Sequence, residues 1–91
     1  MALRIIVENW RQRVRVKIRT VMHGPGPSEA IVAIEKKEGG QEEVVVDRRL
    51  ICDGTIEVAK IGADNESVLV ELPQESASGT WRIWVDSASL V

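Results

Sequence analysis

Apolar and cationic side chains alternate along residues 11–22, RQRVRVKIRTVM, and this pattern constrains the fold more than any other feature of the sequence. A period of two is typical of a β-strand with one buried face. In a helix the same cations would surround the cylinder and leave no apolar stripe. We therefore expect an extended segment whose core-facing side chains are Val14, Val16, Ile18, Thr20 and Met22. The opposite, cationic face consists of Arg11, Arg13, Arg15, Lys17 and Arg19.

The composition favours a small globular domain built from strands. The chain has 91 residues, of which 44% are hydrophobic and 29% are charged, so residues 1–91 are expected to form one domain with a single core. It has three tryptophans but no phenylalanine and no tyrosine. The core must then consist of valine, isoleucine, leucine and alanine, a set rich in the β-branched residues that strands prefer.

Six further segments are predicted to be strands: residues 2–8, 29–37, 42–52, 55–61, 68–72 and 80–86. The segment 29–37 also admits a helix between a Ser28 N-cap and Gly39, but its β-branched residues favour a strand. The segment 42–52 is long enough to bend near residues 47–49. Asp53-Gly54 lies between two apolar runs and predicts a two-residue type I′ turn.

Seven short strands separated by turn signals predict an all-β fold, a single seven-stranded antiparallel β-sandwich of immunoglobulin-like type. A small closed β-barrel is the alternative. The ending from Val70 to Asp86, with Leu72-Pro73 and the run GTWRIWV, is similar to the last hairpin of immunoglobulin-like sandwich domains, macroglobulin-type domains included. The cysteine pair and the tyrosine corner of immunoglobulin domains are missing from the sequence.

The expected compartment follows from the single cysteine, Cys52, which has no partner for an internal disulfide. The apolar run at the N-terminus is too short for a signal peptide, and no segment is long enough for a membrane span. We expect a protein of the cytoplasm or of a virion, without a membrane partner. An extracellular domain excised from a larger chain is the alternative.

The residues that usually carry catalysis are scarce, and we expect no enzyme, no cofactor and no metal site. His23 and Cys52 are the single histidine and cysteine, and a catalytic thiol–imidazole pair would require them to meet. We interpret Cys52 as a buried structural thiol and His23 as a loop residue. The adjacent Glu42 and Glu43 alternate faces on a strand and are expected to be solvated.

Charge is distributed unevenly along the chain, although the net charge is only −2. Residues 1–23 contain six cations and one anion, whereas residues 25–75 contain five cations and twelve anions. This separation favours contact between opposite charges, either within one molecule or between copies.

The predicted binding surface consists of Trp10, Arg11, Arg13, Arg15, Lys17, Arg19, Arg82 and Trp84. Trp84 shares a strand face with Arg82 and is expected to point outward as an interface anchor, whereas Trp81 is expected in the core. The first hypothesis is a non-enzymatic protein–protein interaction or assembly module, a structural protein that binds copies of itself.

Single-stranded nucleic-acid binding is the alternative hypothesis. Cations at every second strand residue are about 6.6–7 Å apart, which is close to the phosphate spacing along a nucleic-acid strand. Trp10 at the end of the row would stack on a base. A competing interpretation is that these cations pair within the molecule with Glu8, Glu35, Glu57 or Glu71.

Overall fold

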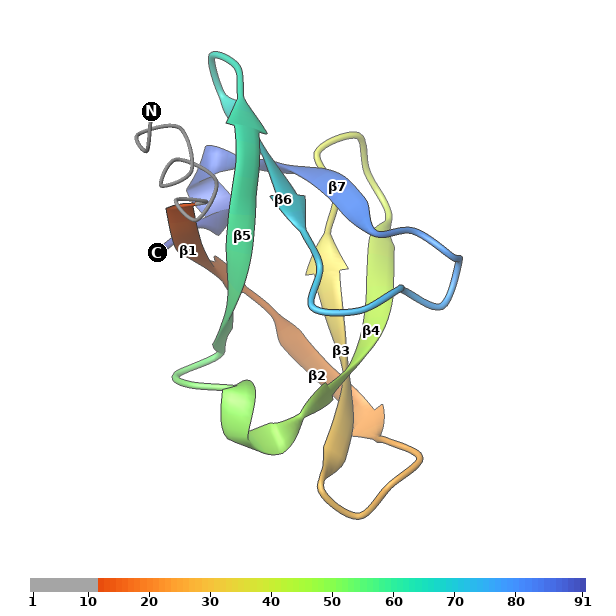
Figure 1. Cartoon of the computed structure of the whole chain (residues 1–91). Helices are drawn as coiled ribbons and strands as arrows, with labels where there is room; N and C mark the ends of the chain where they lie inside the picture. The colour runs from red at the N-terminus through yellow and green to blue at the C-terminus, as the bar shows by residue number, and fades with distance from the viewer. Residues whose placement is uncertain (1–11) are drawn as a thin grey trace, which may run out of the picture.

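The computed structural model describes residues 12–91 (Figure 1). The predicted strand at residues 2–8, and the predicted site residues Trp10 and Arg11, lie outside them. The strands are β1 (Gln12–Lys17), β2 (Arg19–His23), β3 (Glu29–Glu35), β4 (Gln41–Asp47), β5 (Thr55–Ala63), β6 (Ser67–Glu71) and β7 (Arg82–Asp86). Two short 3₁₀ helices complete the described elements, η1 (Arg48–Leu50) and η2 (Ser87–Ser89).

The strands form two antiparallel sheets, a four-stranded sheet with the order β1-β5-β6-β7 and a three-stranded sheet with the order β2-β3-β4. The predicted seven-stranded antiparallel β-sandwich is confirmed. Among the described strands no ladder joins β4 to β7, so the sheets do not close into the alternative barrel. The strand order differs from that of an immunoglobulin constant domain. What this fold shares with immunoglobulin-like sandwiches is the two-layer architecture and the antiparallel β6–β7 hairpin.

One continuous segment, residues 12–23, contributes to both sheets (Figure 1). Its first part, β1, pairs with β5, and its second part, β2, pairs with β3. The change of sheet occurs at Ile18, whose backbone N–H donates to the Gly54 carbonyl at 2.9 Å. The prediction of an extended segment is confirmed, but the prediction of one strand with one cationic face is wrong.

A β-bulge in β2 changes which side chains face the core. Thr20 lies opposite Val32 and Met22 lies opposite Ile31, so Val21 is an extra residue without a partner. One extra residue reverses the alternation of a strand. Met22 is consequently 55% exposed and Thr20 is also exposed, contrary to the prediction for both.

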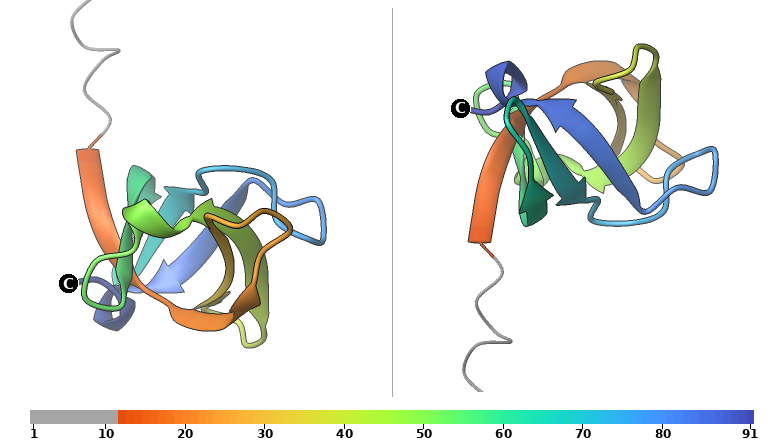
Figure 2. Two further views of the ribbon diagram at one scale, coloured as in Figure 1. Left: turned by 90° about the horizontal axis from the view of Figure 1, so that it is seen from below. Right: turned by 90° about the horizontal axis from the view of Figure 1, so that it is seen from above.

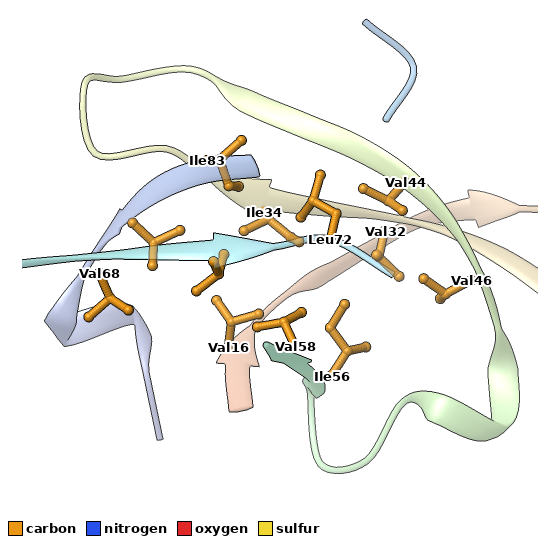
Figure 3. Packing of buried hydrophobic residues seen from close by; sticks show 12 residues of the cluster. Val16, Val32, Ile34, Val44, Val46, Ile56, Val58, Val68, Leu72 and Ile83 are labelled. Atoms are coloured by element: carbon orange, nitrogen blue, oxygen red, sulfur yellow. The ribbon is translucent and has the colours of Figure 1, made fainter. Parts of the chain in front are cut away.

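The core lies between the two sheets and is aliphatic, as the composition predicts (Figure 3). Burying each valine or isoleucine side chain stabilises the fold by about 1.5–3 kcal/mol. Val14 and Ile18 pack against this cluster, as predicted from the alternation. Its fully enclosed members are Val16, Val32, Ile34, Val44, Ile56, Val58, Val70 and Val85.

Trp81 does not belong to the core, contrary to the prediction. It precedes β7 and is 51% exposed, because the strand begins only at Arg82. Its carbonyl accepts a hydrogen bond from the Leu72 N–H at 2.8 Å, which closes the β6–β7 connection.

The predicted turns and bends are largely confirmed. Asp53 and Gly54 have φ angles of 51° and 71°, as a type I′ turn requires. Residues 29–37 form strand β3, not the alternative helix, and the long segment 42–52 bends after β4 into η1. Cys52, at the start of the turn, is exposed, and the interpretation as a buried thiol is wrong because β4 ends at Asp47.

Candidate interaction surface

Three of the predicted site residues, Arg13, Arg15 and Lys17, lie on the outer face of the four-stranded sheet, and we call them the basic edge. Their neighbours Val14 and Val16 point inward, so the alternation turns the cations outward. Arg13 and Lys17 are exposed and Arg15 is half-buried.

Two side chains of the basic edge, those of Arg13 and Arg15, contact β5. Arg13 Nε lies 3.9 Å from Glu57 Oε1, and both side chains are more than half exposed. Such a pair contributes little to stability. Arg15 Nε donates to Thr55 Oγ1 at 2.7 Å, so its guanidinium is held by a neutral group. Of the expected internal carboxylate partners in the described part of the chain, Glu57 alone forms an ion pair with the basic edge.

Arg19 is separated from the basic edge because it lies in the other sheet. It is opposite Ala33 on the outer face of β2-β3-β4, and its Nη2 atom donates to Gln41 Oε1 at 2.9 Å. The evenly spaced row of cations predicted from the sequence therefore ends at Lys17.

Trp84 projects from the outer face of the four-stranded sheet, as predicted, and is 38% exposed. It lies opposite Leu69, which in turn lies opposite Gly62, so the three residues form a row across β7, β6 and β5. We call this row the tryptophan row. In the adjacent row Arg82 Nη2 lies 3.4 Å from Glu71 Oε2. The predicted site residues Arg82 and Trp84 are thus neighbours on one face.

The outer face of the three-stranded sheet carries a second surface that the sequence interpretation missed. Met22, Ile31 and Val45 lie opposite one another across β2, β3 and β4 and form an apolar row. On one side of this row lie Glu29 and Asp47, and on the other side lies Glu43, in a row that also contains Ala33 and Arg19. We call the apolar row together with the outward carboxylates the acidic face; the carboxylates are Glu29, Glu35, Glu43 and Asp47.

Asp47 is engaged by a neighbour within its own segment. It accepts hydrogen bonds from the side chain and the backbone N–H of Arg49, and these bonds lower the pKa of Asp47 to about 2. Glu29 Oε1 accepts from the Gly26 N–H at 2.9 Å. Glu35, which is exposed, and Glu43, which is half-buried, are therefore the carboxylates of the acidic face best placed to meet a partner.

A cleft of about 530 Å³ opens where β1 and β2 diverge. Helix η2 borders this cleft. The two residues that follow η2 hold it beside β1, since Leu90 forms an isolated β-bridge with Val16 and the Val91 N–H donates to the Arg15 carbonyl at 3.0 Å. In Figures 1 and 2 the C-terminus accordingly lies beside β1. Charges of both signs line this cleft: Lys17, Arg19, Glu35 and Asp86.

A buried carboxylate, Glu42, holds the β6–β7 connection against β4. It is 6% exposed and accepts hydrogen bonds of 2.7 Å from Ser76 Oγ and from Ser78 Oγ. Lys36 Nζ lies 3.1 Å from its second oxygen. The two serine hydroxyls, and then the ammonium group, hold the pKa of Glu42 below its ordinary value. The prediction of a solvated residue is wrong for Glu42.

The same connection covers the free edge of β4, and in Figure 1 it crosses this strand. The Ala77 N–H donates to the Glu43 carbonyl at 2.8 Å, and the Gln74 side chain donates to the Val45 carbonyl. Covering an edge in this way prevents unspecific strand pairing. Contacts at β4 must therefore use its outer side chains.

The residues considered for catalysis do not come together. His23 Nδ1 lies 2.6 Å from Arg48 Nη2, whereas Cys52 Sγ lies 3.9 Å from Asp53 Oδ2. Residues 12–91 contain no group of three or more His, Cys, Asp or Glu side chains arranged to hold a metal ion.

A membrane crossing by a helix needs a long apolar helix, and the described part of the chain has none. Comparison of the chain with protein-family models, with curated proteins and with solved structures found no match.

Proposed function

We propose that this protein is a non-enzymatic interaction module that binds copies of itself. The observation that carries this proposal is the tryptophan row, in which Trp84 projects from a sheet face instead of entering the core. A tryptophan at such a position presents a large apolar surface with one polar atom, and it is a frequent anchor of protein interfaces.

The apolar row of the acidic face supports the same proposal. The outer faces of a sandwich are expected to be polar, because water covers them. Here both outer faces carry an apolar row, one around Leu69 and Trp84 and the other around Met22 and Ile31. A domain of 91 residues buries a modest core, so covering these rows by a second copy would add stability.

Nucleic-acid binding is less well supported. It would require a row of free cations on one face, but Arg19 lies on the other sheet and Arg15 is held by Thr55. Trp84 is also displaced from the basic edge, because β5 and β6 separate β1 from β7. Oligonucleotide binding is therefore an outcome to be tested, not the proposal.

Size-exclusion chromatography with light scattering tests the proposal over a series of protein concentrations. We expect the mass to rise with concentration above the 10.1 kDa of one chain. Trp84→Ala should weaken association at least about tenfold, since an interface anchor contributes about 1.4 kcal/mol or more. Trp81→Ala is the matched control, because it removes an exposed tryptophan outside the tryptophan row. A wild-type mass of one chain at every concentration would refute the proposal.

A further inference from the structure

We infer that the contact between copies is heterologous, with the four-stranded sheet of one copy against the acidic face of the next. This inference rests on the proposed self-association and adds which two surfaces meet. It follows from the opposite charges and the matching apolar rows of the two outer faces.

The outward charges of the four-stranded sheet are mixed, with a cationic excess. The cations on this face are Arg13, Arg15, Lys17 and Arg82, and the anions are Glu57, Glu71 and Asp86. Two of these anions are already engaged, Glu57 by Arg13 and Glu71 by Arg82. Lys17 is the exposed cation at the end of the basic edge.

The acidic face has the opposite balance. Its four outward carboxylates share the face with one cation of the described strands, Arg19, which donates to the neutral Gln41. One of the four, Asp47, is already paired with Arg49.

Because the two sheets pack through their inner faces, these outer faces point away from each other. Within one molecule the basic edge and the acidic face approach each other at the cleft between β1 and β2, whose lining includes Lys17 and Glu35. Arg13 and Glu43 lie outside this lining, so a second copy can pair them.

The apolar rows make the faces complementary in a second respect. On one face Leu69 and Trp84 lie one row away from Arg82, and on the other Met22 and Ile31 lie one row away from Glu43. These charged rows are about 6.6–7 Å from the apolar rows along the strands. Each contains both signs, because Arg82 is paired with Glu71 and Arg19 lies in the row of Glu43, so the match depends on the apolar rows and on the overall charge of each face. Stacking the two faces would cover both rows and pair the remaining charges.

A two-fold symmetric contact through the acidic face would place its carboxylates opposite one another, which disfavours association. A contact between two different faces leaves one free face of each kind on every dimer, so growth continues to rings or filaments. We therefore expect assembly beyond the dimer, and we expect this assembly to weaken as ionic strength rises.

Two charge-reversed variants test this assignment. One variant, called the basic variant because it changes the basic edge, carries Arg13→Glu and Lys17→Glu. The other, called the acidic variant because it changes the acidic face, carries Glu35→Lys and Glu43→Lys. Each variant has lost one of the two faces, and each should associate at least tenfold more weakly than the wild type. Glu66→Lys, in the exposed β5–β6 turn, is the control for an added positive charge away from both faces.

Mixing the two variants is the decisive measurement. The intact acidic face of the basic variant should bind the intact basic edge of the acidic variant, and the two reversed surfaces, now of opposite sign to each other, should also bind, so that the mixture forms assemblies in which the variants alternate. A single chain carrying all four reversals should recover self-association. Wild-type assembly without association in the mixture would overturn the heterologous contact and leave self-association intact. A monomeric wild type would overturn both.

Discussion

Replacing Glu42 with alanine tests whether this carboxylate holds the β6–β7 connection in place. Glu42 accepts two hydrogen bonds of 2.7 Å and lies 3.1 Å from the Lys36 ammonium. A hydrogen bond to a charged group contributes about 1.5–3 kcal/mol, and truncation leaves the buried Ser76 hydroxyl without its acceptor. Water replaces part of the loss at Ser78 and Lys36, which are more exposed.

We expect Glu42→Ala to lower the free energy of unfolding by about 2–4 kcal/mol. For a domain of this size that corresponds to a decrease of about 10–25 °C in Tm. Glu42→Gln retains acceptors for both serines but loses the ion pair, so it should cost about half as much. Urea unfolding followed by circular dichroism, at a concentration where the chain is monomeric, measures these differences.

Glu43→Ala is the matched control for this experiment. Glu43 faces outward, and the bond that ties it to Ala77 uses its backbone carbonyl, which the substitution leaves in place. Its cost should stay within about 0.5 kcal/mol. Equal losses for Glu42→Ala and Glu43→Ala would refute the reasoning, because they would show that the buried network adds nothing to stability.

Four further predictions concern Glu42, Asp47, Cys52 and the basic edge. The lowered pKa of Glu42 stabilises the fold above the ordinary glutamate value of 4.5, so the advantage of wild type over Glu42→Gln should disappear as pH falls below that value. Carboxyl NMR titration should give Asp47 a pKa of about 2 in the wild type and a higher one in Arg49→Ala. The exposed Cys52 should react with a thiol reagent in the native protein as fast as in urea, and slow native reaction would contradict its position. Fluorescence anisotropy should show no binding of single-stranded oligonucleotides at physiological salt, and tight binding that Arg13→Glu abolishes would support the nucleic-acid alternative.

The sequence predicted the elements whose signals are local. Asp53-Gly54 predicts a type I′ turn because few other residues accept two positive φ angles, and both angles are found. The alternation in residues 82–86 placed Trp84 outward and Ile83 inward. These features depend only on neighbours within a few residues, so the pattern alone determines them.

The features that the sequence did not predict depend on contacts between distant segments. The change of sheet at Ile18 and the bulge at Val21 are set by pairing with β5 and β3, and a regular alternation carries no sign of either. Glu42 is buried because Ser76 and Ser78, more than thirty residues away, reach it from a loop.

Part of the acidic face can be predicted from the sequence, but the complete face can be recognised only from the pairing register of the strands. Glu29 and Glu35 alternate with the inward Ala30 and Ile34, which already assigns both carboxylates to the outer face. The apolar row, however, becomes visible only when the bulge in β2 turns Met22 outward opposite Ile31. Predicting a site that spans three strands therefore requires knowing how those strands pair. The alternation of residues along the sequence does not give this pairing.

Sedimentation velocity of the wild-type chain, as a function of concentration at low and at high ionic strength, tests the central claim most directly. Copies that bind through oppositely charged outer faces should give a sedimentation coefficient that rises with concentration at low salt and falls toward the monomer value at high salt. A single species with the mass of one chain under all conditions, at low salt above all, would contradict it.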